Sequence, residues 1–188
     1  QILEKNNIFY MATAGTLLSA VRHKALMPWD DDADMVYMIQ DHDKILDLQN
    51  QFNHHDIEIK SYNPGLMIYW KNNISIAIDM FSLDKDSKGV YRYSYPLLKN
   101  TIPSFYTSKY CFPKEYFYPS DLESVSAPLN HYRIKVSKNA ETLVKRFYSK
   151  DVMSIVKMSN STQMHRYRYL LPFVEKNMNN LKKNKYIY

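Results

Sequence analysis

The segment from Ile74 to Leu83 constrains the fold most, because its side chains alternate between two faces. Successive side chains of a β-strand point to opposite faces of the sheet. One face carries Ile74, Ile76, Ile78 and Met80, and the other carries Ser75, Ala77, Asp79 and Phe81. Asp79 is the only charged residue of this segment, and a carboxylate that is buried needs a partner. The pattern therefore predicts a strand and a polar contact for Asp79.

The rest of the chain predicts an α+β fold, with helices packed on a mixed β-sheet. Further strands are expected at Ile8–Ala14, Ala33–Ile39, Ile57–Tyr62 and Leu66–Trp70. Helices are expected at Thr16–His23, Asp41–Asn53, Ala140–Tyr148 and about Thr162–Leu181. Between Tyr91 and Pro128, frequent prolines predict loops, short strands and one-turn helices. We expect a single domain over residues 1–188, with a core of about 8–151 and a C-terminal helical region of about 152–188.

Composition excludes several classes of protein. A hydrophobic content of 45% indicates a globular chain, and the lone cysteine, Cys111, excludes an intramolecular disulfide or a Cys-rich zinc site. The net charge of +6 suits anionic substrates, but nucleic acid is not the expected partner because no basic-aromatic module repeats. No apolar run is long enough to span a membrane. We expect a cytoplasmic or membrane-peripheral location. A removed N-terminal anchor with a Golgi-type location stays open, because the chain starts at Gln1 without Met.

Four carboxylates stand in the run Asp30-Asp31-Asp32-Ala33-Asp34, which leads directly into an apolar strand. Asp32 and Asp34 are two residues apart, so their side chains share one face of that strand. Two carboxylates so placed can chelate a hard cation such as Mg²⁺ or Mn²⁺. If the strand of Asp79 lies beside them, all three can share one metal ion. Asp30 is expected to order the loop instead of binding metal.

Plainer interpretations of the same residues stay open. The acidic run also fits a solvated turn or a calcium-type loop, and Asp79 alone could cap a turn or pair with an arginine. Gly15 and Thr16 stand where a strand gives way to a helix, so they could hold a phosphate or simply start that helix. Arg22, His23 and Lys24 follow that helix. They could bind the same phosphate or only offset the helix dipole.

The run from Gly15 to Lys24, followed by Met27 to Asp34, resembles the signature of the LicD family. That family includes bacterial phosphocholine transferases and the fukutin-related ribitol-phosphate transferases, and it belongs to the nucleotidyltransferase-fold superfamily. Ile78-Asp79-Met80-Phe81 and Phe147-Tyr148-Ser149-Lys150-Asp151 are similar to later family segments. Three residues depart from the family pattern, namely Ser19, Val36 and Ser149, and these bear on the shape of the pocket.

The resemblance implies a metal-dependent transferase that moves a phosphocholine or ribitol-phosphate group from a CDP-linked alcohol to a hydroxyl of a glycan or lipid-linked saccharide. Asp32 and Asp34 would bind Mg²⁺ or Mn²⁺, and Asp79 would complete the site or accept the hydroxyl proton. The substrate-binding residues would be Gly15, Thr16, Arg22, His23, Lys24 and Trp29. Aromatic residues between Tyr91 and Tyr118 could stack on the donor or only pack the domain. The alternatives are a nucleotidyltransferase acting on a small molecule, RNA or protein, and a non-catalytic accessory module of the same fold.

Overall fold

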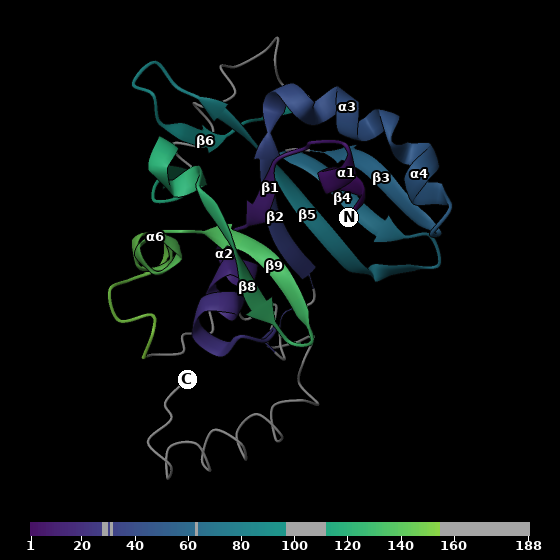
Figure 1. The fold of residues 1–188 in the computed structure, drawn as a ribbon. Coiled ribbons are helices and arrows are strands. Elements are labelled where there is room, and N and C mark those ends of the chain that lie inside the picture. Colours follow the sequence, from purple (N-terminus) through teal and green to yellow (C-terminus); the bar gives the residue numbers. More distant parts are fainter. Residues whose placement is uncertain (28–29, 31, 63, 97–111, 155–188) are drawn as a thin grey trace.

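The computed structural model describes residues 1–27, 30, 32–62, 64–96 and 112–154. Within these residues, seven strands form one sheet in which β1, β2, β5, β4 and β3 lie in that order, with β6 and β7 continuing from β5 (Figure 1). The strands are β1 (Tyr10–Ala12), β2 (Asp32–Met38), β3 (Ile57–Tyr62), β4 (Gly65–Trp70), β5 (Asn73–Lys85), β6 (Tyr91–Tyr93) and β7 (Tyr116–Phe117). A separate hairpin consists of β8 (Ser124–Leu129) and β9 (Tyr132–Ser137).

The sheet is mixed, because β2 and β5 run parallel while their other neighbours run antiparallel. Helices accompany it, which confirms the predicted α+β class. They are α1 (Ile2–Lys5), α2 (Ala14–Leu18), α3 (His42–Asp47), α4 (Gln49–Asn53) and α6 (Ala140–Phe147). A π-helix, η1 (Ser19–His23), continues α2, and two 3₁₀ turns are η2 (Ile39–Asp41) and η4 (Pro119–Leu122). No helix of the described segments combines the length and the apolar character that crossing a membrane requires.

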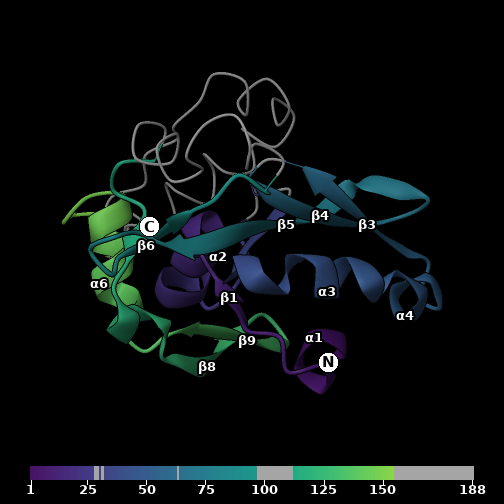
Figure 2. The same cartoon turned by 90° about the horizontal axis from the view of Figure 1, so that it is seen from above.

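Two apolar clusters hold the layers together, one on each face of the sheet. Helices α3 and α4 run along one face of β3, β4 and β5 (Figure 2), where Ile45, Leu48 and Phe52 pack with Tyr37 and Met80. The other face is covered by α2, α6 and the β8–β9 hairpin, at the lower left of Figure 1. Its core members include Leu17, Val36, Leu83, Val136 and Leu143. The buried residues of α3 and α4 thus face the sheet.

The boundaries of some elements differ from the sequence prediction. The helix predicted from Asp41 to Asn53 is divided at Leu48, which separates α3 from α4. Gly15 does not stand between strand and helix, because α2 already begins at Ala14, after the extended residue Thr13. The short strands expected between Tyr91 and Pro128 are present as β6, β7 and most of β8, but β9 and the pairing of β8 with it were not predicted. The helix expected over Thr162–Leu181 lies outside the described residues, and the single-domain organisation stays a prediction.

Candidate active site

Asp34 and Asp79 occupy directly paired positions on the parallel strands β2 and β5. Paired residues of neighbouring strands point to the same face, so the two carboxylates leave the sheet together. Asp32 precedes Asp34 by two residues and shares that face, where its partner across the strands is Ala77. The same face carries Val36 and Phe81 farther along, within the cluster under α2 and α6. The sheet therefore brings together the three acids that the sequence singled out.

The step from β1 into α2 holds Asp34 through three hydrogen bonds. The Gly15 N–H donates to the Asp34 carboxylate at 3.0 Å, and the Asp34 N–H donates to the Thr16 hydroxyl at 2.8 Å. The Thr13 N–H donates to the Asp34 carbonyl at 3.0 Å. The Gly-Thr pair thus lies at the acidic site, and both residues contact Asp34. Their contact with a phosphate stays a prediction.

Gly15 is packed closely against two carboxylates. A Cβ at this position would lie 2.9 Å from Oδ2 of Asp30 and 3.2 Å from Oδ2 of Asp34. Only glycine leaves room for both groups where they are. The Asp30 N–H donates to the Met27 carbonyl at 3.0 Å. The Asp30 carboxylate lies beside the acids of β2, so Asp30 contributes charge to the site. Its expected role in ordering the loop stays a prediction.

The convergence of these acids is electrostatically costly without a cation. Burial raises the pKa of Asp34 to about 8, and the neighbouring charges of Asp32, Asp30 and Asp79 add to the rise. The hydrogen bond from Gly15 acts in the opposite direction. A divalent cation among these groups would relieve the repulsion and favour the ionised form. As the described side chains stand, no three His, Cys, Asp or Glu residues form a ready-made metal site. A metal ion would therefore need the carboxylates to turn toward it.

Two tyrosines adjoin the acids, and the sequence analysis assigned neither of them a role in the site. Tyr62, on β3, makes a side-chain hydrogen bond with Asp79, and burial together with Asp79, Asp34 and Asp32 raises its pKa. Tyr148 follows α6 directly. Burial and the charges of Asp34, Glu115 and Asp30 raise its pKa, so its hydroxyl stays protonated and can donate. With 17 tyrosines in the chain, residue type gave no signal to choose these two.

Glu115 is a further carboxylate near the site that the sequence did not indicate. The Tyr93 hydroxyl donates to Glu115 Oε2 at 2.7 Å and lies 3.1 Å from the Thr13 hydroxyl. Burial raises the pKa of Glu115, while the hydrogen bond from Tyr93 lowers it. Tyr93 and Thr13 are both fully buried. A polar chain therefore runs from Glu115 to the start of α2.

The basic residues expected to bind substrate are Arg22, His23 and Lys24, and they make contacts with other parts of the fold. The Arg22 guanidinium donates to the Val152 carbonyl at 2.8 Å and to His23 Nε2 at 2.7 Å. Burial, together with the charge of Arg22, lowers the pKa of His23 to about 4, so His23 is neutral at pH 7. Lys24 is exposed, and its carbonyl accepts the Asn130 N–H of the β8–β9 turn. A role for these three residues in substrate binding stays a prediction. Trp29 lies outside the described residues.

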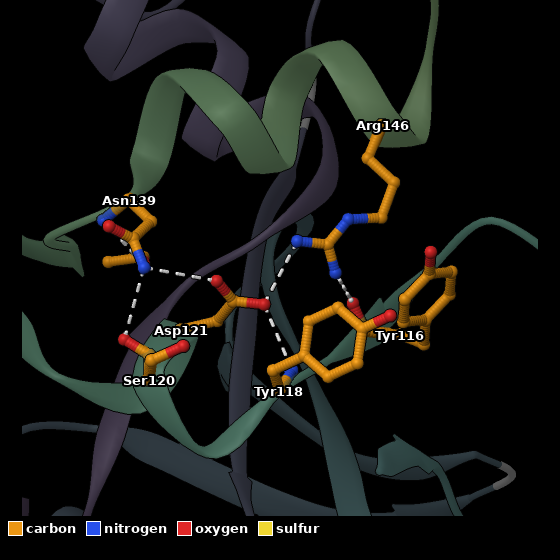
Figure 3. A network of polar contacts seen from close by, with 7 residues as sticks. Tyr116, Tyr118, Ser120, Asp121, Asn139 and Arg146 are labelled. Carbon is orange, nitrogen blue, oxygen red and sulfur yellow. Dashed lines mark hydrogen bonds and ion pairs between the residues drawn. The ribbon is translucent and has the colours of Figure 1, made fainter.

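The segments that carry Glu115 and Tyr148 are joined by a network around Asp121 (Figure 3). The Asp121 carboxylate, which is 3% exposed, accepts hydrogen bonds from Arg146 at 3.0 Å and from the Tyr118 N–H at 2.9 Å. Arg146 also donates to the Tyr116 carbonyl at 2.8 Å. The network ties α6 to β7 and η4, and so positions the elements next to Glu115 and Tyr148. Asn139 adds a hydrogen bond to Asp121 at 3.3 Å.

The departures from the resembled pattern fall at buried or locally bonded positions. Ser19 begins the π-helix η1 and is fully buried. Within the part of the chain described, its hydroxyl has no hydrogen-bond partner. Val36 is fully buried in the core, and the Ser149 hydroxyl donates to Asp151. With these three residues present, the acids of β2 and β5 still occupy their positions on the paired strands.

The sequence is similar to those of two bacterial proteins. An uncharacterized protein of Rickettsia prowazekii is 30% identical over 133 residues, which cover 71% of this chain and 42% of that protein. The lipopolysaccharide cholinephosphotransferase LicD of Haemophilus influenzae is 40% identical over 89 residues, 47% of this chain and 33% of that protein. The chain thus spans less than half the length of these relatives.

Among solved structures, the lincosamide antibiotic adenylyltransferase LnuA in its lincomycin-bound form is similar with a TM-score of 0.45 and 11% identity. The similarity covers 79% of this chain and 80% of that chain. The family model LicD/FKTN/FKRP, nucleotidyltransferase domain, matches residues 7–136, which is more than half of the chain. That range contains Gly15, Thr16 and the three acids of β2 and β5. The chain therefore belongs to the LicD/FKTN/FKRP nucleotidyltransferase domain family.

Proposed function

We propose that this domain transfers a phospho-alcohol group, of the phosphocholine or ribitol-phosphate type, from a CDP-linked alcohol to a hydroxyl of a glycan or lipid-linked saccharide. The observation that carries the proposal is the pairing of Asp34 with Asp79 across β2 and β5, with Asp32 on the same face. The relative from Haemophilus influenzae, a lipopolysaccharide cholinephosphotransferase, supports this class of transferred group and acceptor.

Asp32, Asp34 and Asp79 would hold Mg²⁺ or Mn²⁺, whose chemistry there is to neutralise phosphate charge and favour in-line displacement. The raised pKa of Asp34 supports this, because repulsion among unshielded carboxylates is what a cation removes. Glycine at position 15 supports it as well, since the space left open there is filled by two carboxylates. Carboxylate oxygens are the ligands that these hard cations prefer.

The residues around the acids suggest how the site would be kept in order. The Gly15 N–H and the Thr16 hydroxyl fix Asp34 on both its carboxylate and its backbone. Tyr62 orients Asp79 through their hydrogen bond, so one Asp79 oxygen would be directed toward the reacting groups. Asp79 would then complete the metal site or accept the proton of the attacking hydroxyl. Tyr148 would contact the donor from the side of α6.

A donor screen tests the proposal. The chain, or the full-length protein that contains it, is incubated with Mg²⁺ and CDP-choline, CDP-ribitol, CDP-glycerol or a nucleoside triphosphate. Release of CMP is measured with and without a saccharide acceptor. We expect release from at least one CDP-alcohol, strengthened by acceptor and abolished by chelation of the metal. A matched control is Asp47→Asn, which removes an exposed acid of α3 and should retain wild-type rates. Turnover of triphosphates alone would instead favour a nucleotidyltransferase.

A further inference from the structure

Thr13 stands at the N-cap of α2 but does not cap it. Its backbone is extended, with φ −134° and ψ −177°, and its side chain makes no capping hydrogen bond. A threonine in this position ordinarily accepts the N–H of the second or third helical residue. The second helical residue here is Gly15, whose N–H donates to the Asp34 carboxylate at 3.0 Å. If the Thr13 hydroxyl turned toward the Gly15 N–H, it would compete with Asp34 for that one donor.

The Thr13 hydroxyl is turned toward Tyr93 instead. The two oxygens lie 3.1 Å apart, and the Tyr93 hydroxyl donates its proton to Glu115 at 2.7 Å. A phenol has a single proton, so the Thr13 hydroxyl must be the donor to Tyr93. The chain of hydrogen bonds therefore runs in one direction, from Thr13 through Tyr93 to Glu115. Burial keeps Tyr93 protonated by raising its pKa.

The ring of Tyr93 is held firmly enough to fix its hydroxyl. It stacks on Phe81 with centroids 4.9 Å apart, and it meets Phe112 edge-on at 5.3 Å and Phe117 at 6.2 Å. Tyr93 is fully buried. Aromatic packing of this kind leaves few rotamers open to the ring. The position of the hydroxyl is thus set by the core and by Glu115.

We propose that Tyr93, anchored by Glu115, is a positioning residue that holds the Thr13 hydroxyl away from α2 and so reserves the Gly15 N–H for Asp34. The contact between the Thr13 and Tyr93 hydroxyls explains why a good capping residue stands at the N-cap without capping. It also gives the buried Glu115 a role that the carboxylate site alone does not. The effect on backbone hydrogen bonding is independent of the reaction, whereas its effect on turnover rests on the proposed function.

Three variants separate positioning from packing. Thr13→Val keeps the shape of the side chain and removes the competing hydroxyl. Tyr93→Phe keeps the Thr13 hydroxyl but removes the phenol oxygen that holds it. The double variant combines the two substitutions. The Gly15 amide resonance in ¹H–¹⁵N NMR spectra reports its acceptor directly. We expect Thr13→Val to leave this resonance in place and Tyr93→Phe to move it. In the double variant the resonance should return, since no competing hydroxyl remains. The matched control is Tyr10→Phe on β1, which removes a hydroxyl that donates to Glu4 of α1.

Donor turnover should follow the same order. Tyr93→Phe should lower it about tenfold, and the double variant should recover to within about threefold of Thr13→Val. Recovery by a second substitution is not expected if Tyr93 acts only through packing. A double variant as slow and as displaced in its Gly15 resonance as Tyr93→Phe would overturn the proposal. A Gly15 resonance that moves in Thr13→Val would also overturn it, and this isosteric variant keeps the test decisive even if Tyr93→Phe does not fold. Absence of any turnover with an unmoved Gly15 resonance in Thr13→Val would count against the proposed function alone.

Discussion

The carboxylates of Asp34 and Asp79 leave paired positions of two parallel strands on the same face of the sheet. Asp32 and Asp30 add their charges to the same region, and the pKa of Asp34 rises to about 8 as a result of burial and of these neighbours. The site is thus built from groups that repel one another. Such an arrangement costs stability in the absence of a cation, and this cost is measurable.

The metal-free protein should lose stability as pH rises. The folded-state pKa of Asp34 lies above that of the unfolded chain, so the folded state binds more protons between about pH 4 and pH 8. Stability is then greatest at the low end of this window and falls toward its upper end. Asp34→Asn should remove on the order of 2 kcal/mol of this dependence. Urea unfolding at pH 5 and pH 8 in EDTA measures it. Equal pH dependence in the wild type and the variant would contradict the assignment, because Glu115 is unchanged in both.

Gly15→Ala should separate activity from stability. The added Cβ would meet the Asp30 and Asp34 carboxylates at 2.9 and 3.2 Å, so both must shift. Alanine is the better helix former by roughly 1 kcal/mol. We therefore expect turnover to fall at least tenfold with little change in melting temperature. Gly65→Ala provides the contrast, because its Cβ would lie 1.9 Å from the Met80 carbonyl oxygen and should prevent folding. Wild-type turnover in Gly15→Ala would show that the close approach is unimportant.

Ser19→Ala should stabilise the protein. The Ser19 hydroxyl is buried and has no hydrogen-bond partner among the described residues. Removing a buried hydroxyl of this kind recovers its desolvation cost, about 1 kcal/mol. The midpoint of urea unfolding should rise accordingly. A loss of stability would mean that the hydroxyl is bonded elsewhere in the chain.

The Asp121–Arg146 pair should be strongly coupled. Both side chains are largely buried, at 4% and 16% exposure, and they lie 3.0 Å apart. Removing either partner leaves the other charge buried, so each single alanine variant should cost about 3 kcal/mol. A double-mutant cycle should show a coupling energy of about 1–3 kcal/mol. The exposed pair Lys138–Glu123, at 65% and 62% exposure, should give less than about 1 kcal/mol. Additive losses at Asp121 and Arg146 would rule out the coupling.

Alternation along the chain was enough to identify the acids and the strands that carry them. Asp79 could be expected on a strand beside Asp32 and Asp34 because it is the only charged residue of its segment, whereas its direct pairing with Asp34 is seen only in the structure. The boundaries were less certain. The break at Leu48 between α3 and α4 was not predicted, because the apolar spacing is the same on either side of it.

Other parts of the site carry no local signal. Glu115 is bonded to Tyr93, 22 residues away, and lies in an aromatic, proline-rich stretch that predicted only loops and short elements. Tyr62 and Tyr148 could not be distinguished by residue type from the other tyrosines of the chain. The β8–β9 hairpin was missed because β8 is mostly exposed and contains Pro128, which weakens the alternation that marks a strand. Tertiary contacts, not periodicity, determine these features.

Replacement of Asp79 by Asn tests the central claim most directly. The variant keeps the size and hydrogen-bonding capacity of the side chain and removes its charge. Mn²⁺ binding is measured by calorimetry, and Mg²⁺-dependent release of CMP from the preferred CDP-alcohol is measured alongside it. The metal-assisted transfer proposed here predicts that Mn²⁺ affinity falls at least tenfold and that CMP release falls at least a hundredfold, while the melting temperature is retained or raised. Wild-type Mn²⁺ affinity and wild-type CMP release in the folded variant would contradict it.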